Sequence, residues 1–365
     1  MDTFAFIIHP IDPKRDVSRK FPLLGKYLTV GQINFFSTFF PPVYISEITG
    51  VRSEATGKAI KGWFVACPYT PQRMLELPVK TVYNKIIRTG HMAHKLGAML
   101  LGLGAFTSVV GDGGVTIAKS LPMPVTTGDS YTVAVAIEAV REAARVMELP
   151  LAHSTAAVVG ATGAIGGVTS ELMAQQVAKL WLIGRPGREA ALEALRTRIV
   201  AQTVCEVQIA TDLRGLPQAD IVLSVTSSGG ELIQPQHLKA GAVVCDVARP
   251  RDVSAKVAAE RGDVLVIDGG MVEVPGAVDF HFNFGFPPRM AYACMAETMA
   301  LALEGRWESY TLGKELTMPQ VQTIAQIAAK HGFRLGGFRS FEKPVSMEQI
   351  ERVAHAAHAQ RKVLA

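Results

Sequence analysis

Three glycines near the middle of the chain have the spacing of a phosphate-binding turn. They form a G-x-x-G-x-x-G pattern directly after the apolar residues TAAVV at 155–159. Between a strand and a helix, the first glycine permits a tight turn, the second lets the backbone approach a pyrophosphate, and the third lets the helix pack on the strand. Amide groups at the start of that helix add partial positive charge. The pattern predicts a dinucleotide site formed by Gly160, Thr162, Gly163, Ala164, Ile165 and Gly166.

The next predicted strand, LWLIG, ends beside Arg185 instead of an acidic residue. Enzymes that use NAD usually place Asp or Glu here to hold the ribose 2′-hydroxyl, whereas a guanidinium can bind a 2′-phosphate with two hydrogen bonds. Arg185, with Arg188 nearby, therefore favours NADPH, and the alternative is a solvated surface arginine. A small polar loop after the fourth strand is expected to lie along the cofactor or to form an ordinary turn. This loop comprises Val225, Thr226, Ser227, Ser228, Gly229 and Gly230.

Cys294 is the candidate nucleophile, in the sequence MAYACMAE. A cysteine in such a helix is often only a small buried apolar residue, so both interpretations are open from composition. If the helix starts near Pro288, Cys294 lies beyond the first turn, where the helix dipole no longer lowers a thiol pKa. Activation would then need a group supplied by the fold. The nearest polar residues on the same helix face are Glu297 and Thr298, and the more distant candidates are His91, His94 and Lys95.

Four phenylalanines alternate with other residues shortly before this cysteine, at 280, 282, 284 and 286. The alternation predicts a half-buried extended segment with one aromatic face. That face either belongs to the ordinary core or forms the wall of an apolar tunnel. Fourteen buried methylenes at ~0.8 kcal/mol each would contribute on the order of 10 kcal/mol to holding an acyl chain, before binding costs are subtracted.

The elements that must position these residues indicate an α/β protein. Six short apolar stretches read as buried strands: TAAVVG, LWLIG, CEVQIA, ADIVLSV, AVVCDV and DVLVID. Segments between the early ones suit helices, which is typical of a parallel sheet covered on both faces. We therefore expect a central Rossmann-like parallel-sheet domain, an α/β N-terminal domain and a helical C-terminal segment. The expected divisions are 1–125, 126–275 and 276–365.

Outside the central region, further elements are predicted. FAFIIHP reads as a strand, and residues 44–67 read as two strands joined by a polar turn at 54–58. Helices are expected over 72–97, 131–147 and 288–305, the last with prolines at its start and Gly305 at its end. A final helix is expected from Ser346, where S-M-E-Q forms a capping box. The 131–147 helix could be capped by Thr127, Asp129 or Ser130.

Composition favours a well-packed globular protein. The chain has 365 residues, of which 48% are hydrophobic and 19% charged, with a net charge of +5. This charge is too low for a nucleic-acid coat. Four cysteines occur without a C-x-x-C pair, so neither a zinc site nor a disulfide scaffold is expected, which favours a reducing, cytoplasmic location. The N-terminus does not resemble a signal peptide, and the apolar stretches at 96–111 and 149–170 are interpreted as core and not as membrane spans.

Eight short motifs follow one another along the chain, and together they resemble a known family. Each is weak alone, but their order over about residues 1–340 is specific. Through them the chain resembles the long-chain acyl-[acyl-carrier-protein] reductases, a fatty-aldehyde-forming family known best from cyanobacteria. The motifs are RDVSR at 15–19, EIT at 47–49, ATGK at 55–58, GAFTS at 104–108, TTG at 126–128, the glycine pattern at 160–166, GGMVE at 269–273 and ACMAE at 293–297.

This resemblance implies an activity and a mechanism. It implies that NADPH reduces a fatty acyl thioester, delivered on acyl carrier protein or more slowly on coenzyme A, to a fatty aldehyde. It also implies that Cys294 is the nucleophile that holds the acyl group before hydride transfer. An aldehyde-consuming enzyme is an implied partner. Each stage develops an oxyanion that needs hydrogen-bond donors, for which the candidates are Thr107, Ser108, Ser130 and the backbone near Gly128.

Departures from the family limit the analogy. The loop at 129–132 reads Asp-Ser-Tyr-Thr, where the cyanobacterial pattern has an Asn and a His, and the segment between Glu273 and Cys294 is rewritten. Magnesium helps the cyanobacterial enzymes, so Mg²⁺ is an implied activator, yet no carboxylate cluster in the sequence defines a metal site. Four basic residues could meet an acidic carrier protein or form a solvated face: Lys14, Arg15, Arg19 and Lys20.

Two alternatives remain open from the sequence. The segment 245–252 resembles the cofactor domain of glutamyl-tRNA reductases and shikimate dehydrogenases, which favours the same nucleotide fold with another substrate. A tRNA reductase would place its nucleophile in the N-terminal domain, where the chain has only Cys67. The second alternative is an NADPH-binding protein without turnover, which the altered loop at Asp129 leaves open.

Overall fold

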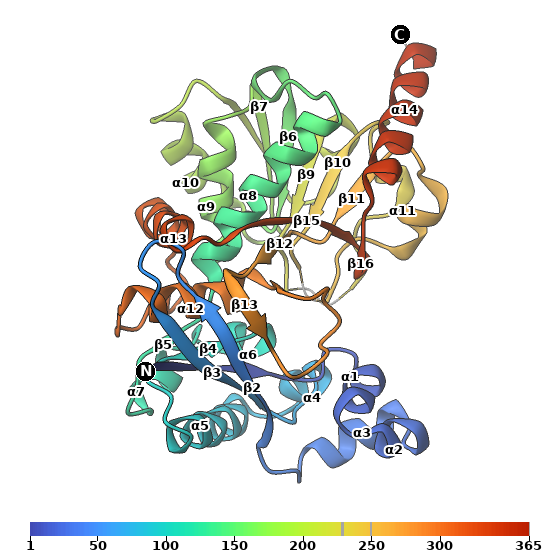
Figure 1. Cartoon of the computed structure of the whole chain (residues 1–365). Helices are drawn as coiled ribbons and strands as arrows, with labels where there is room; N and C mark the ends of the chain where they lie inside the picture. The colour runs from blue at the N-terminus through green and yellow to red at the C-terminus, as the bar shows by residue number, and fades with distance from the viewer. Residues whose placement is uncertain (228–229, 249, 365) are drawn as a thin grey trace. The chain divides into compact units, whose positions relative to one another are not determined.

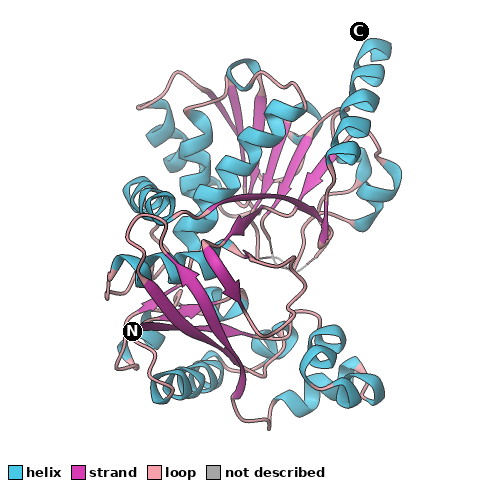
Figure 2. Cartoon of the chain, in the orientation of Figure 1, coloured by secondary structure: helices cyan, strands magenta, loops and turns pink. Residues whose placement is uncertain are grey.

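The protein folds into two compact units. The computed structural model describes residues 1–227, 230–248 and 250–364 (Figures 1 and 2). The first unit comprises residues 1–131, 272–315 and 320–334, and the second comprises residues 132–271, 316–319 and the C-terminal segment from Leu335. Ser228 and Gly229 of the predicted cofactor loop, and Arg249 of the 245–252 segment, lie outside the described residues.

The second unit is built on a six-stranded sheet in which all strands are parallel, in the order β11-β10-β9-β6-β7-β8 (Figure 1). The predicted six strands and the α/β fold class are confirmed. Nearly every residue of the central strands is buried, which explains their continuous apolar runs. The strands are β6 Thr155–Val159, β7 Lys179–Ile183, β8 Glu206–Ala210, β9 Ile221–Ser224, β10 Val243–Asp246 and β11 Leu265–Ile267.

Helices connect and flank these strands. Helix α9 packs on β6 and β7, and α10 packs on β8. The capping box predicted at Ser346 is present, since Gln349 N–H donates to Ser346 Oγ at 3.2 Å. The helical elements are α8 Asp129–Val146, α9 Ala164–Ala174, α10 Glu189–Val200, α11 Ala255–Glu260 and α14 Met347–Leu364, with short 3-10 turns at Leu151–His153, Leu216–Gln218 and Pro235–His237. Strands β15 Arg334–Ser340 and β16 Lys343–Pro344 form an antiparallel pair.

The first unit contains a mixed six-stranded sheet in the order β13-β2-β3-β1-β4-β5. Strands β3, β1, β4 and β5 are parallel, whereas β2 is antiparallel to β3 and β13. The predicted pair of strands with a turn at 54–58 is confirmed as β2 and β3. The bounds are β1 Asp2–Ile8, β2 Val43–Arg52, β3 Ala59–Ala66, β4 Leu101–Leu103, β5 Val125–Thr126, β12 Gly270–Glu273, β13 Gly276–Asp279 and β14 Met290–Ala291.

Two long helices cover opposite faces of this sheet. A side chain on Gly90 of α5 would meet Leu101 of β4, while one on Gly102, the next residue of β4, would lie 2.1 Å from Thr298 Oγ1 of α12. Successive residues of a strand point to opposite faces, so α5 and α12 lie on opposite sides. The helices are α1 Pro13–Lys20, α2 Pro22–Tyr27, α3 Val30–Ser37, α4 Pro71–Glu76, α5 Val79–Lys95, α6 Phe106–Val109, α7 Val115–Lys119, α12 Ala293–Glu304 and α13 Met318–His331.

Helix α12 starts five residues later than the sequence predicted. Residues 290–291 form β14, whose backbone pairs antiparallel with β12, Ala291 opposite Val272. This pairing keeps the segment after Pro288 extended, so the helix begins at Ala293 with Tyr292 as its N-cap. Gly305 ends the helix as predicted, with a positive φ of 75°.

The alternating phenylalanine segment is not the predicted extended strand. Strand β13 ends at Asp279, and His281 has a φ of +47°, which breaks the extended backbone. The compact units also group the chain differently from the three predicted segments. Residues 272–315 belong with the N-terminal sheet because α12 buries ten residues against β1, β4 and β3.

Candidate active site and cofactor site

The glycine turn of the second unit has the geometry that the sequence predicted. Gly160 has a φ of +91°, where a side chain is strained, and a Cβ on Gly166 would lie 2.1 Å from the Gly160 carbonyl oxygen. Gly163 is the N-cap of α9 and lies in the open, since a Cβ there would meet only the Gly160 oxygen at 3.4 Å. The turn is held by Gly160 N–H and Ala161 N–H, which both donate to Ile183 O. Thr162, Ala164 and Ile165 complete the turn and the first residues of the helix.

The loop after β9 lies against this turn. A Cβ on Gly160 would lie 3.2 Å from the Thr226 nitrogen and the Val225 carbonyl carbon. Thr226 Oγ1 donates to Asp252 Oδ1 at 2.6 Å, and Ser224 Oγ donates to Asp252 Oδ2 at 2.6 Å. The buried Asp252 therefore fixes the Thr226 side chain. Ser227 directly follows Thr226 and is exposed.

Arg185 is exposed at the carboxyl end of β7. Within the described part of the chain its guanidinium makes no hydrogen bond or ion pair with a side chain, so its donors are available to a ligand. Arg188, the N-cap of α10, is exposed beside it. A 2′-phosphate fits this pair of guanidinium groups better than a bare ribose does.

Cys294 occupies the second position of α12, inside the first helical turn. This corrects the expectation that it lies beyond the first turn. Its side chain is half-buried, and the backbone N–H groups of Met295 and Cys294 act to lower the pKa of its thiol. Burial of the thiol and the carboxylates of Glu297 and Asp129 act in the opposite direction, and the net pKa of Cys294 rises to about 12. Without ligand, the sulfur is therefore a protonated thiol at neutral pH.

Gly128 brings the loop after β5 into direct contact with this cysteine. It has a φ of +79°, and a Cβ at this position would lie 2.2 Å from Cys294 Cβ and 2.4 Å from Cys294 Cα. Only glycine permits this approach. The TTG motif at 126–128 is thereby explained as a structural support for the cysteine and for the start of α12.

Glu297, one turn after the cysteine, is fully buried and accepts four hydrogen bonds. Ser130 Oγ and Tyr131 N–H donate to Oε2 at 2.6 and 2.8 Å, while the hydroxyls of Thr126 and Thr311 donate to Oε1. Desolvation raises the pKa of Glu297, and these donors oppose that rise. The carboxylate ties α12 to β5 and to the start of α8, which fixes the cysteine relative to the loop at 126–131.

Asp129 is the other carboxylate that acts on Cys294. It is the first residue of α8, directly after Gly128. Burial, followed by repulsion from Glu297, raises its pKa from 3.8 to about 7. A carboxyl group that titrates near neutral pH beside a thiol can accept and return a proton. Asp129 departs from the cyanobacterial pattern, and its position directly after Gly128 was the signal in the sequence for this role.

Other polar residues predicted for the reacting site are engaged elsewhere. Thr107 Oγ1 donates to Gly104 O at 2.8 Å, Ser108 Oγ donates to Ala105 O at 2.7 Å, and Ser130 Oγ donates to Glu297. Their hydroxyls are therefore not free donors for an oxyanion. The side chains of His91, His94 and Lys95 are exposed on α5.

A row of aromatic rings leads to the N-cap of α12. Phe64 of β3 stacks on Phe280, which contacts Phe284, and Phe284 contacts Phe286. Phe286 meets the ring of Tyr292 at 4.4 Å between centroids. Tyr292 lies two residues before Cys294, so this row provides an apolar surface that ends near the thiol.

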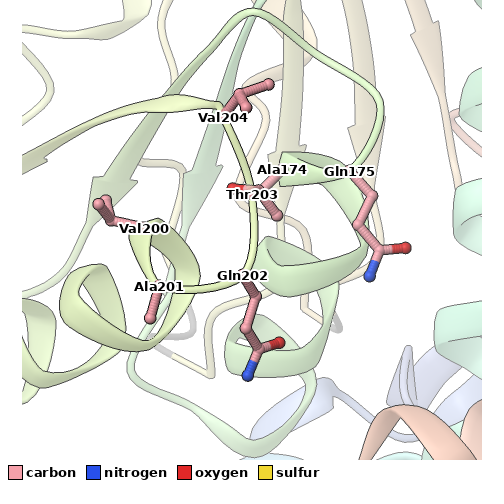
Figure 3. A pocket seen from close by; sticks show the side chains of 7 residues that line it. All are labelled: Ala174, Gln175, Val200, Ala201, Gln202, Thr203 and Val204. Atoms are coloured by element: carbon pink, nitrogen blue, oxygen red, sulfur yellow. The ribbon is translucent and has the colours of Figure 1, made fainter.

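A surface hollow in the second unit lies away from the glycine turn. It has a volume of about 520 Å³ and is lined by Ala174, Gln175 and residues 200–204 (Figure 3). Ala174 is the last residue of α9 and Val200 is the last residue of α10, whereas the glycine turn precedes the N-terminus of α9. Its lining has no charged side chain and no nucleophile, so we assign it no role.

The described residues contain neither a metal-binding cluster nor a membrane-spanning helix. No group of three or more His, Cys, Asp or Glu side chains could hold a metal ion. No described helix is long and apolar enough to cross a membrane.

Comparisons with known proteins were made for the sequence and for the fold. Residues 141–269 match the family described as shikimate / quinate 5-dehydrogenase. The chain is 31% identical over 310 residues to the aminotransferase PigE of a Serratia species, covering 84% of this chain and 36% of that protein. The chain thus spans about a third of that relative. It is also 28% identical over 346 residues to the long-chain acyl-[acyl-carrier-protein] reductase of Synechococcus elongatus, covering 91% of this chain and 98% of that protein.

Two solved structures were found to be similar to the chain at low sequence identity. Shikimate 5-dehydrogenase from Listeria monocytogenes has a TM-score of 0.36 and 13% identity, covering 90% of this chain and 96% of that one. L-tryptophan dehydrogenase from Nostoc punctiforme has a TM-score of 0.42 and 11% identity, covering 99% and 89%.

The parallel sheet, its glycine turn and the matched family together indicate a Rossmann-type oxidoreductase that uses a nicotinamide cofactor. The family match covers the six strands of the parallel sheet and helices α9, α10 and α11, and stops before Cys294. The family match therefore supports the kind of cofactor and does not indicate the substrate.

Proposed function

We propose that the protein reduces a long-chain fatty acyl thioester to a fatty aldehyde with NADPH, through an acyl group held on Cys294. The observation that supports this most is the arrangement of Cys294 in the first turn of α12, beside Asp129 and against Gly128. The likeness to the Synechococcus enzyme over nearly the whole of both chains supports the same activity. The acyl donor is acyl carrier protein or acyl-CoA.

Asp129 is the proton acceptor in this proposal. The thiol of Cys294 is protonated at neutral pH, so its attack on a thioester needs a base. Asp129 takes the thiol proton as the new carbon–sulfur bond forms, and returns it to the departing thiolate of the carrier. After hydride addition, collapse of the thiohemiacetal frees the aldehyde and regenerates the Cys294 sulfur. A carboxyl group with a pKa of about 7 is suited to both directions of transfer.

The start of α12 supplies hydrogen-bond donors for the oxyanion that forms at each stage. The first backbone N–H groups of a helix have no partner inside the helix, and those of Cys294 and Met295 belong to the first turn of α12, at the cysteine itself. An acyl oxygen on this sulfur would lie next to them. In this proposal these amides donate hydrogen bonds to the oxyanion, in place of the hydroxyls of Thr107, Ser108 and Ser130 that were candidates from the sequence.

NADPH fits the residues of the second unit and supplies the hydride when bound. Gly160, Gly163 and Gly166 leave the start of α9 open to a pyrophosphate, and the exposed Arg185 offers its guanidinium to a 2′-phosphate. Mg²⁺ has no support in the described residues and forms no part of the proposal. The aromatic row from Phe64 to Tyr292 is proposed as the apolar surface for the acyl chain.

Acyl transfer to Cys294 tests the proposal without the cofactor. We expect intact-protein mass spectrometry to show the gain of one acyl group after incubation with palmitoyl-CoA, mapped to Cys294. Cys294→Ala should remove this gain and all aldehyde formation, while NADPH still binds. The matched control Cys67→Ala removes a buried thiol of the same unit and should leave both intact. Full aldehyde formation by Cys294→Ala would exclude the covalent route.

Reduction of another carbonyl substrate is a second candidate, favoured by the match of residues 141–269 to the shikimate / quinate 5-dehydrogenase family. Oxidation of shikimate or quinate with NADP⁺ is the direct assay. Turnover of either that survives Cys294→Ala would favour this candidate over the proposed one.

A further inference from the structure

Helices α2 and α3 of the first unit, with the residues that flank them, expose an unusually apolar surface. Nine large apolar side chains between residues 21 and 44 are exposed, including Leu23 and Phe39, each 70% exposed, and Tyr27, 71% exposed. Phe35 makes ring contacts with Phe36 and Phe39 at 5.4 and 5.5 Å. These nine residues, called here the aromatic surface, are Phe21, Leu23, Tyr27, Val30, Phe35, Phe36, Phe39, Phe40 and Tyr44. The helices that present them lie together beside the first sheet (Figure 1).

Helix α3 buries polar side chains and exposes aromatic ones, which is the reverse of an ordinary surface helix. Two of its three buried residues, Asn34 and Ser37, are polar, whereas Phe35 and Phe36 face outward. Asn34 accepts a hydrogen bond from the buried Thr70 hydroxyl before α4. An amphipathic surface helix normally buries its apolar stripe. This helix instead uses hydrogen bonds to hold its aromatic side outward.

The turn after α3 is fixed by a buried lysine. Lys85 Nζ of α5 donates to Thr38 O at 3.1 Å and to Phe40 O at 2.6 Å, and Arg73 Nε donates to Thr38 Oγ1 at 2.7 Å. Phe39 and Phe40 are thus presented on an ordered turn. An exposed apolar surface that the fold holds in place is typical of a binding surface.

The charges around the aromatic surface fit an anionic lipid surface. Residues 17–46 contain no Asp or Glu, and their three basic residues are Arg19, Lys20 and Lys26. Lys26 is exposed beside Tyr27, with its ammonium 5.4 Å from the ring centroid, so that an apolar ring and a cation face the same side. Aromatic rings with nearby lysines are the usual composition of helices that lie in the membrane interface.

An acidic carrier protein fits this surface less well. Recognition of an acidic protein uses several exposed cations at once, whereas here Arg19 pairs with Asp16 and Lys20 donates to Ile45 O at 2.6 Å, so the attraction to an anionic bilayer comes mainly from Lys26. The apolar side chains here outnumber the remaining cations. We infer that α2, α3 and the residues that flank them, over 21–44, form a docking surface through which this protein binds the face of an anionic lipid bilayer, with the aromatic surface entering the headgroup region.

Co-sedimentation of the full chain with vesicles tests this inference. We expect binding to vesicles of phosphatidylcholine with phosphatidylglycerol that is about tenfold stronger than to phosphatidylcholine alone, and that weakens with salt. Phe35→Ser with Phe39→Ser should weaken binding about a hundredfold, because each ring is more than half exposed and available for burial in the bilayer. Lys26→Glu should weaken binding only to the anionic vesicles.

The control Val204→Ser alters a fully exposed apolar residue of the second unit and should bind like the unaltered protein. All four substituted residues are exposed, so circular dichroism should show unchanged folding. The inference is overturned if neither vesicle binds the protein. It is also overturned if light scattering shows a dimer that the double Phe substitution dissociates, because the surface would then be occupied by a second copy of the chain.

Discussion

Asp129→Asn is expected to make the protein more stable and less active at once. Below pH 3.8 this carboxyl is protonated in the folded and unfolded states, and it does not affect stability. Between pH 3.8 and about 7 the unfolded chain loses this proton while the folded protein keeps it, so the free energy of unfolding falls as the pH rises. At about 1.4 kcal/mol per pH unit, the loss over some three units is on the order of 4 kcal/mol. Asparagine does not titrate and removes this loss.

Urea unfolding at pH 4 and pH 8 measures the effect on stability. The variant should match the original protein at pH 4 and exceed it at pH 8 by up to about 4 kcal/mol. Acyl transfer from palmitoyl-CoA to Cys294 should slow by about 10²–10⁴-fold at pH 8, since the base is gone. The control Asp212→Asn alters an exposed carboxylate whose pKa is lowered to about 2 by Arg214, and it should not speed or slow acyl transfer. Undiminished acyl transfer in Asp129→Asn would refute the proton-acceptor role.

Two further predictions concern the cofactor site. Arg185→Ala should weaken NADPH binding about tenfold or more and leave NADH binding nearly unchanged, because only NADPH has the 2′-phosphate. Fluorescence titration measures both affinities. An equal loss of affinity for the two cofactors would contradict the role of Arg185. Gly166→Ala should abolish binding of both cofactors, because its Cβ would lie 2.1 Å from Gly160 O. The control Gly167→Ala should bind both normally, because the nearest atom to its Cβ would be 3.8 Å away. Similar binding by the two variants would contradict the packing argument.

The second unit could be predicted well from the sequence because its signals are local. Each strand is a short apolar run between turns, and the glycine pattern at 160–166 needs only its own strand and helix. Burial on both faces imposes the same apolar pattern on every central strand. Gly166 illustrates this, since the contact that requires glycine there is with Gly160, six residues away.

The start of α12 could not be predicted in the same way. Pro287 and Pro288 are a reasonable start signal for a helix, but β14 is formed by pairing with Val272, nearly twenty residues upstream. The backbone pairing between β14 and β12 therefore outweighed the local preference of this segment for starting a helix. The phenylalanine alternation failed similarly, because ring contacts with Phe64, more than two hundred residues away, fold that segment instead of extending it.

The surroundings of Cys294 were only partly predictable. Its neighbour Glu297 is visible at helical spacing, but Gly128 and Asp129 approach it from a segment more than 160 residues earlier. The TTG motif marked that segment as unusual without indicating what it contacts. The raised pKa of Asp129 depends on burial, which no local pattern encodes.

The most direct test of the account is the site of acyl attachment. Incubation with palmitoyl-CoA in the absence of NADPH, followed by peptide mass spectrometry, should place one acyl group on Cys294, and added NADPH should then release it as the aldehyde. An unmodified Cys294 under conditions in which the same sample produces aldehyde would contradict the account.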